Sequence, residues 1–136
     1  MFLFINTARK NKIEVALFDI NKNNKIKILN KMTSRAKSDK LLIIIDKLLQ
    51  KEKASLGKLK RIFVVNGPGP FTAVRMAIAT ANTLAYGLNI PVRGVKFEKN
   101  KNIENLIKFY CQPLKDMKIK KYVKPREDFD FYSKFK

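Results

Sequence analysis

The chain has 136 residues, an apolar content of 46% and a formal net charge of +19, so we expect a single domain with a modest core. It contains no histidine and one cysteine, Cys111, which excludes a Ser-His-Asp triad, an internal disulfide and an ordinary structural zinc site. It has no apolar run of roughly 18 residues, and its start, MFLFINTARK, lacks the features of a signal peptide, so we expect a cytoplasmic protein without a membrane span.

The first thirty residues predict three strands. Residues 1–6 (MFLFIN) and 13–20 (IEVALFDI) are apolar runs, and residues 25–30 (KIKILN) alternate strictly between polar and apolar. Asn23 and Asn24 form a typical turn signal between the second and third strands. We therefore expect an antiparallel meander whose third strand has one face in water.

A helix is predicted from Ser38 to about Lys51, with the Ser38 side chain as its N-cap. Its core face would consist of five apolar residues at helical spacing: Leu41, Leu42, Ile45, Leu48 and Leu49. Ile43 and Ile44 extend the apolar surface around the helix, so we expect this helix to be buried on more than one side.

The next segment predicts two strands connected by a helix. Residues 61–65 (RIFVV) and 92–95 (VRGV) are short apolar strands. The helix between them is predicted from Phe71 to Tyr86, with Gly87 ending it in the position after the C-cap.

A third helix near 101–111 and a basic, aromatic tail over 113–136 complete the chain. Three antiparallel strands followed by strand-helix-strand crossovers are typical of the ribonuclease-H-like lobe of the actin/Hsp70 (ASKHA) superfamily. The predicted fold class is therefore α/β, with a mixed five-stranded sheet and flanking helices.

Residues 61–95 contain no lysine, aspartate or glutamate, although the chain has 24 lysines. Because lysine is almost never fully buried without a partner, we expect this segment to be the most enclosed part of the protein. One face of its helix carries Thr72, Arg75, Met76, Ala79 and Thr83, and small residues recur every four positions at Ala73, Ala77, Ala81 and Ala85. Two interpretations stay open, tight packing within the monomer and a helix-helix interface with another chain.

The stretch 66-NGPGPFTAVR-75 precedes this helix. A phosphate cradle is disfavoured because Pro68 and Pro70 remove two backbone N–H donors, and a catalytic turn is disfavoured because no nucleophile or base is nearby. Gly67 and Gly69 allow unusual backbone angles that the prolines then fix. We interpret the motif as a rigid corner that aims the helix.

The net charge admits two explanations. A polyanion such as RNA is the obvious partner of a strongly basic chain, whereas the excess of 24 lysines over 6 arginines is also typical of an A/T-rich coding sequence. The tail 113–136, in which lysines alternate with Tyr and Phe, could contact tRNA or single-stranded RNA.

Several motifs together resemble the TsaB (YeaZ) family. Residues 67–95 contain GPGPFTAVR, ATA, LA, NIP and GV in the order of that family. The stretches 4-FINTA-8, 15-VAL-17, 38-SDKLLIIIDKLL-49 and 122-YVKPRE-127 also match its motifs.

The resemblance implies an actin-like protein that is not itself the enzyme. Members pair with the ATP-dependent transferase TsaD, TsaE joins them, and together they place threonylcarbamoyl on the adenosine next to the anticodon of tRNAs that read codons beginning with A. The pairing uses the first two helices of each partner, which correspond here to 38–51 and 71–86. The expected interface residues are Ile43, Ile44, Thr72, Arg75, Met76, Ala79 and Thr83.

Two of the chain's departures from the family bear on its function. Asn6 replaces the Asp of the family's first motif, which removes a carboxylate suited to metal-nucleotide chemistry. Family members have two lobes, and we expect here one lobe over 1–97 and a reduced second lobe over 98–136, a helix plus a basic aromatic tail. No catalytic residue, metal or cofactor is therefore expected. A basic RNA-binding module and a homodimer without a role in tRNA modification are the alternative functions.

Overall fold

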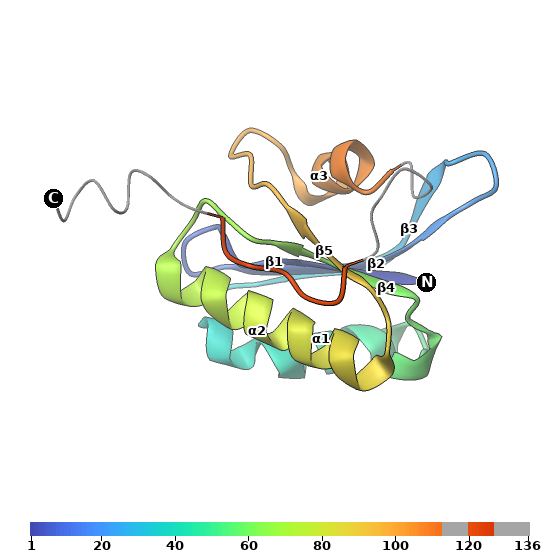
Figure 1. Cartoon of the computed structure of the whole chain (residues 1–136), viewed down its shortest axis with the longest axis horizontal. Coiled ribbons are helices and arrows are strands. Elements are labelled where there is room, and N and C mark those ends of the chain that lie inside the picture. Colours follow the sequence, from blue (N-terminus) through green and yellow to red (C-terminus); the bar gives the residue numbers. More distant parts are fainter. Residues whose placement is uncertain (113–119, 127–136) are drawn as a thin grey trace, which may run out of the picture.

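The computed structural model describes residues 1–112 and 120–126, which form a five-stranded mixed sheet with helices on both faces (Figure 1). The strands are β1 (Phe2–Asn6), β2 (Ile13–Ile20), β3 (Ile26–Ser34), β4 (Arg61–Val65) and β5 (Val92–Val95). The helices are α1 (Leu41–Lys51), α2 (Phe71–Leu88) and α3 (Ile103–Tyr110), and short 3-10 turns, Ser38–Lys40 and Leu56–Lys58, precede α1 and β4.

The sheet order is β3-β2-β1-β4-β5. β1, β2 and β3 pair antiparallel, whereas β4 pairs parallel to β1 and β5 pairs parallel to β4. The predicted meander is confirmed, and so are the two crossovers that follow it, through α1 and α2. Asn24 adopts a φ of 60° between β2 and β3, as expected for a turn residue that tolerates the left-handed region.

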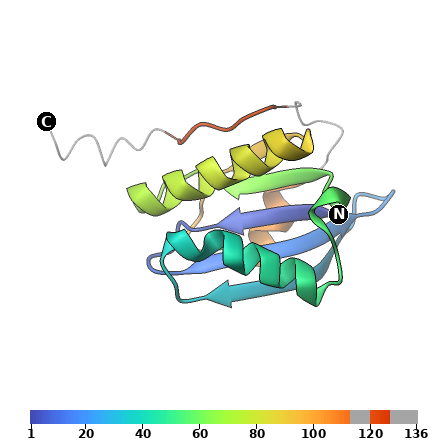
Figure 2. The same cartoon turned by 90° about the horizontal axis from the view of Figure 1, so that it is seen from below.

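Two helical layers enclose the sheet. α1 and α2 lie side by side across one face, and α3 lies on the opposite face (Figures 1 and 2). Because both faces are covered, all five residues of β1 are buried, which explains its continuous apolar run. The rings of Phe2, Phe18 and Phe63 pack with centroids 5.5 to 6.3 Å apart in this core.

The third strand is longer than the sequence pattern predicts. The alternation in 25–30 predicts the strand correctly, but β3 continues to Ser34 because it pairs with the whole length of β2. It forms an edge of the sheet, and its lysines are of the kind that discourages pairing with another chain.

Both helix-end predictions need correction. Ser38 opens a 3-10 turn instead of capping α1, and no side chain caps that helix at Lys40. α2 continues through Gly87 to Leu88, and Asn89 takes the left-handed conformation with a φ of 54°. Asn tolerates this conformation better than most residues, so the stop signal lies two residues beyond the glycine.

None of the helices in the described ranges has the length and apolar character needed to cross a lipid bilayer. Within the same ranges, no three Cys, Asp or Glu side chains gather closely enough to hold a metal ion. The aromatic positions after Tyr122 that were expected to form part of an RNA-binding tail lie outside the described residues.

Candidate functional site

The glycine-proline corner joins β4 to α2. Gly67 has a φ of 114°, which strains any residue with a side chain. A Cβ on Gly69 would lie 2.9 Å from the Cβ of Ala8, so the loop after β1 packs directly against the corner. The Thr7 hydroxyl donates a hydrogen bond of 2.8 Å to the Ala73 carbonyl and thereby ties the first turn of α2 to β1.

The outer face of α2 is exposed along its length. The five side chains expected there, Thr72, Arg75, Met76, Ala79 and Thr83, all lie on the surface. The expectation of enclosure therefore holds for β4, which is buried from Ile62 to Val65, but not for this half of α2. Three large side chains belong to the same face, with exposed fractions of 45% for Phe71, 37% for Met76 and 87% for Tyr86.

The repeated small residues have an explanation within the monomer. Ala77, Ala81 and Ala85 are at most 1% exposed, because they lie on the side of α2 that packs against the sheet. The small-residue spacing thus does not mark an interface, and only Ala79 belongs to the outer face.

On α1 the exposed pair differs from the expected pair. Ile44 is only 5% exposed and belongs to the core, so its expected place in an interface is wrong, whereas Ile43 is 52% exposed. Leu42, predicted to lie in the core, is 57% exposed. The buried set follows i, i+3, i+4, i+7 from Leu41, and this stricter spacing would have placed Leu42 outside.

Together these residues form a surface that we call the α1–α2 face, consisting of Leu42, Ile43, Phe71, Thr72, Arg75, Met76, Ala79, Thr83 and Tyr86. Two contacts organise it. The Arg75 guanidinium lies 4.1 Å from the Phe71 ring centroid, and the Ser38 hydroxyl donates to the Met76 sulfur at 3.1 Å. Phe71 and Tyr86 were not predicted for this face, although both fall on its helical spacing.

Asn6 takes part in a closed polar network at the end of β1. The side chain is fully buried, donates to the Glu14 carboxylate at 2.9 Å and accepts the N–H of Ala8 at 2.9 Å. Arg9 neutralises the same carboxylate at 2.7 Å. An Asp at position 6 would place a second carboxylate against Glu14, and like charges at that distance disfavour ionisation.

The described part of the motif 122-YVKPRE-127 lies beside α2 and β5, and Glu127 is outside the described residues. Asn82 of α2 binds both backbone groups of Val123, accepting from its N–H at 2.8 Å and donating to its carbonyl at 2.9 Å.

Cys111 is buried on the α3 side, and burial raises the pKa of its thiol far above the ordinary value. It therefore lacks the thiolate that a nucleophile needs.

Comparisons with known proteins agree on one family. The family model of TsaD, tRNA N6-adenosine threonylcarbamoyltransferase, matches residues 22–97. The transferase of that name from Geotalea daltonii is 38% identical over 68 residues, which are 50% of this chain and 20% of that protein. The tRNA threonylcarbamoyladenosine biosynthesis protein TsaB from Buchnera aphidicola of Schizaphis graminum is 32% identical over 74 residues, 52% of this chain and 35% of that protein.

Solved structures give the same answer for the fold. YeaZ from Pseudomonas aeruginosa superposes with a TM-score of 0.58 and 26% identity, over 70% of this chain and 43% of that one. A second structure, of a protein described as similar to peptidase YeaZ from Pseudomonas aeruginosa, superposes equally well. The predicted actin-like fold is confirmed. This chain spans only about a fifth to a third of the length of the two named curated relatives.

Proposed function

This chain belongs to the TsaD family, on its TsaB (YeaZ) side, and from that premise we propose that it is a non-catalytic partner subunit in the biosynthesis of threonylcarbamoyladenosine in tRNA. Its partner would be a TsaD-like transferase in the cytoplasm, with a TsaE-like ATPase as the further component. In this proposal residues 1–97 are the actin-like lobe that carries the pairing surface, and 98–136 are a reduced second lobe.

The α1–α2 face is the observation that carries this proposal. It places Leu42, Ile43, Phe71, Met76 and Tyr86 in water on one side of the molecule. A chain with 24 lysines would be expected to place some of them on such a helix, yet α2 has none. Exposed apolar side chains with few charges among them are typical of a surface that another protein covers.

The non-catalytic role is supported by the chemistry of the remaining polar groups. The buried carboxylate near the start of α2 belongs to Glu14, and it already accepts hydrogen bonds from the side chains of Asn6 and Arg9. The backbone N–H of Val74 bonds to the Pro70 carbonyl, and prolines replace the amides that would hold a phosphate in the corner. The residues near the corner therefore suit a structural role better than nucleotide chemistry.

Co-expression with a cognate TsaD-like transferase, followed by gel filtration, tests the proposal. We expect the two wild-type chains to co-elute and Ala79→Glu to separate them, because an unpaired charge buried in an interface costs roughly 3–5 kcal/mol. The matched control is Phe109→Glu, since Phe109 is 62% exposed on α3, across the sheet. Separate elution of the wild-type chains, or equal effects of both variants, would refute the pairing.

The same face could join two copies of this chain instead. Sedimentation velocity of the isolated chain at several concentrations would detect such a homodimer. If the transferase does not displace one copy, the homodimer replaces the heterodimer as the better description.

A further inference from the structure

The segment 120–126 is fixed against the outer side of β5. The N–H of Val92 donates to the Lys120 carbonyl at 3.0 Å, and Val123 is buried, with both backbone groups bound by Asn82. These bonds hold the backbone as a strand partner would. The side chains of the segment are therefore presented from a fixed path.

A second anchor fixes the other end of the segment. The Asn66 side chain donates to the Lys124 carbonyl at 2.9 Å. Arg126 donates twice to Asn66, from its side-chain Nε to Oδ1 at 2.6 Å and from its backbone N–H to the backbone carbonyl at 2.8 Å. The Asn66 side chain fits here only because residue 94 is a glycine. A Cβ atom on residue 94 would lie 2.4 Å from the Nδ2 atom of Asn66.

An open cavity of about 710 Å³ lies between this segment and β5. Its described lining contains no carboxylate and five cationic side chains: Arg93, Lys120, Lys121, Lys124 and Arg126. We call this site the β5 cationic pocket. Partial burial is the main cause that lowers the pKa of Arg126; the neighbouring Tyr110 raises this pKa, and the charge of Arg93 lowers it by the smallest of the three effects. Because these five cations line one pocket, a bound anion would relieve the repulsion between them.

Aromatic surface accompanies these charges. Tyr122 lines the pocket, is 59% exposed, and has the Lys124 ammonium 5.9 Å from its ring centroid. Cations that follow a backbone of phosphates, together with an aromatic ring on which a base can stack, are the features by which proteins bind single-stranded nucleic acid.

We propose that the β5 cationic pocket binds the phosphate backbone of single-stranded RNA, with one base stacked on Tyr122. The site shares no residue with the α1–α2 face, and only the choice of RNA rests on the proposed role in tRNA modification. Binding by the isolated chain does not require the transferase, so the two proposals fail separately.

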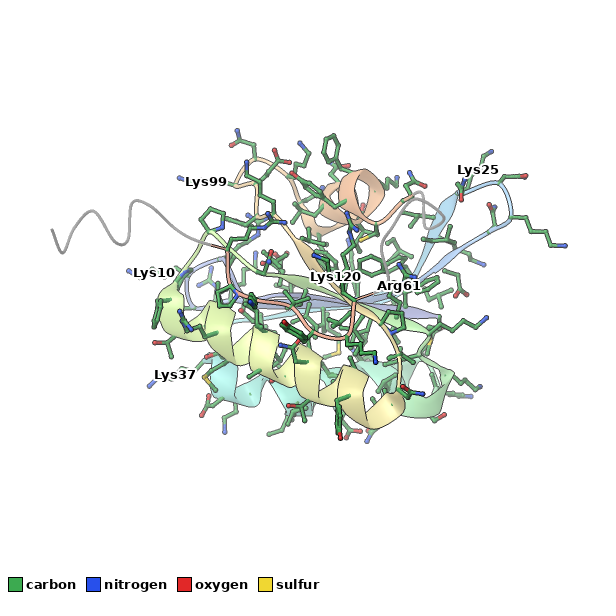
Figure 3. The ribbon with its side chains drawn as sticks, viewed as in Figure 1. Lys10, Lys25, Lys37, Arg61, Lys99 and Lys120 are labelled. Carbon is green, nitrogen blue, oxygen red and sulfur yellow. The ribbon has the colours of Figure 1, made fainter. Side chains whose placement is uncertain are left out.

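The difficulty in testing this site is the general charge of the protein. Lys10, Lys25, Lys37 and Lys99 project from the periphery in several directions (Figure 3), and any of them will attract RNA weakly. A test must therefore remove the same charge inside and outside the pocket.

Anisotropy titration of a short fluorescein-labelled oligouridine, at several salt concentrations, makes this comparison. We expect Lys120→Gln/Lys124→Gln to weaken binding about tenfold, and to reduce the slope of log affinity against log salt by about 1.4. The control Lys25→Gln/Lys27→Gln changes the net charge equally on the exposed β2–β3 hairpin, and should change affinity less than about twofold. Tyr122→Ala should lower affinity about tenfold without changing the slope.

Three outcomes would contradict the proposed RNA-binding site. One is an equal loss of affinity in the pocket and hairpin variants. Another is displacement of the oligonucleotide by ATP or inorganic phosphate at the same phosphate concentration, which would indicate a site for a small phosphate ligand. The third is binding to phosphatidylserine vesicles with the same dependence on Lys120 and Lys124.

Discussion

The two sides of α2 border surfaces of opposite character. Among the residues that define it, the α1–α2 face has Arg75 as its only cation and five exposed large apolar side chains, while Asp46 and Lys47 are exposed one turn farther along α1. The β5 cationic pocket has five cations around one tyrosine. The composition alone, a net charge of +19, would predict a uniformly basic surface.

The difference between the two surfaces shows that cationic side chains are not distributed evenly over the exposed residues. A bias toward lysine in the coding sequence would place lysine wherever water reaches, and the exposed side of α2 shows that something excludes it there. In the pocket, by contrast, hydrogen bonds donated by the Asn66 and Asn82 side chains fix the backbone that carries the cations. The two proposals account for this sorting, the first surface by a covering protein and the second by a bound anion.

Gly94→Ala should have the largest effect, and it should affect the β5 cationic pocket alone. The new Cβ would displace the Asn66 side chain, which would release Lys124 and Arg126 from their anchors. We expect more than tenfold weaker RNA binding and a loss of about 1–3 kcal/mol in the free energy of unfolding in urea. Pairing with the transferase should persist.

The control for this variant is Gly57→Ala, since the nearest group to a Cβ at position 57 is 4.0 Å away. It should change neither RNA binding nor stability. Unchanged RNA binding in Gly94→Ala, despite a normal fold, would show that the segment does not position the cations.

Thr83→Lys tests the absence of lysine from the other surface. Thr83 is exposed on α2, so the isolated chain should tolerate the change with an unaltered melting temperature. In the complex the new ammonium would lose water without gaining a partner, and we expect about tenfold weaker pairing, measured by isothermal titration calorimetry. Asn105→Lys, at an exposed position of α3, is the matched control, and equal affinities of the two variants would place the interface elsewhere.

Much of the fold was predictable because its signals are local. Central strands buried on both faces show apolar runs, and the bounds of β2, β4 and β5 agree with the pattern residue by residue. The motif 67–95 indicates the family from the sequence alone, because the corner and α2 occupy one continuous stretch of it.

Two kinds of feature escape a reading of local patterns: a choice between competing local signals, and contacts between residues far apart in the chain. The left-handed Asn89 was overlooked because Gly87 offered a stronger local signal. The anchors of segment 120–126 join Asn66 and Asn82 to residues about 40 to 60 positions later, a pairing that no local pattern contains. The β5 cationic pocket therefore cannot be derived from the sequence, although its lysines are present there.

Two exposed tyrosines, one on each surface, allow the effects on pairing and on RNA binding to be compared directly. Tyr86 is 87% exposed at the end of the α1–α2 face, and Tyr122 is 59% exposed in the pocket. Because Tyr86 lies at the end of α2, its loss should cost a peripheral contact, and we expect Tyr86→Ala to weaken pairing about fivefold while leaving RNA binding unchanged. Tyr122→Ala should have the reverse profile. If either variant weakens both pairing and RNA binding, the two surfaces act as one site. The contrast between an apolar surface and a cationic one would then need a different explanation.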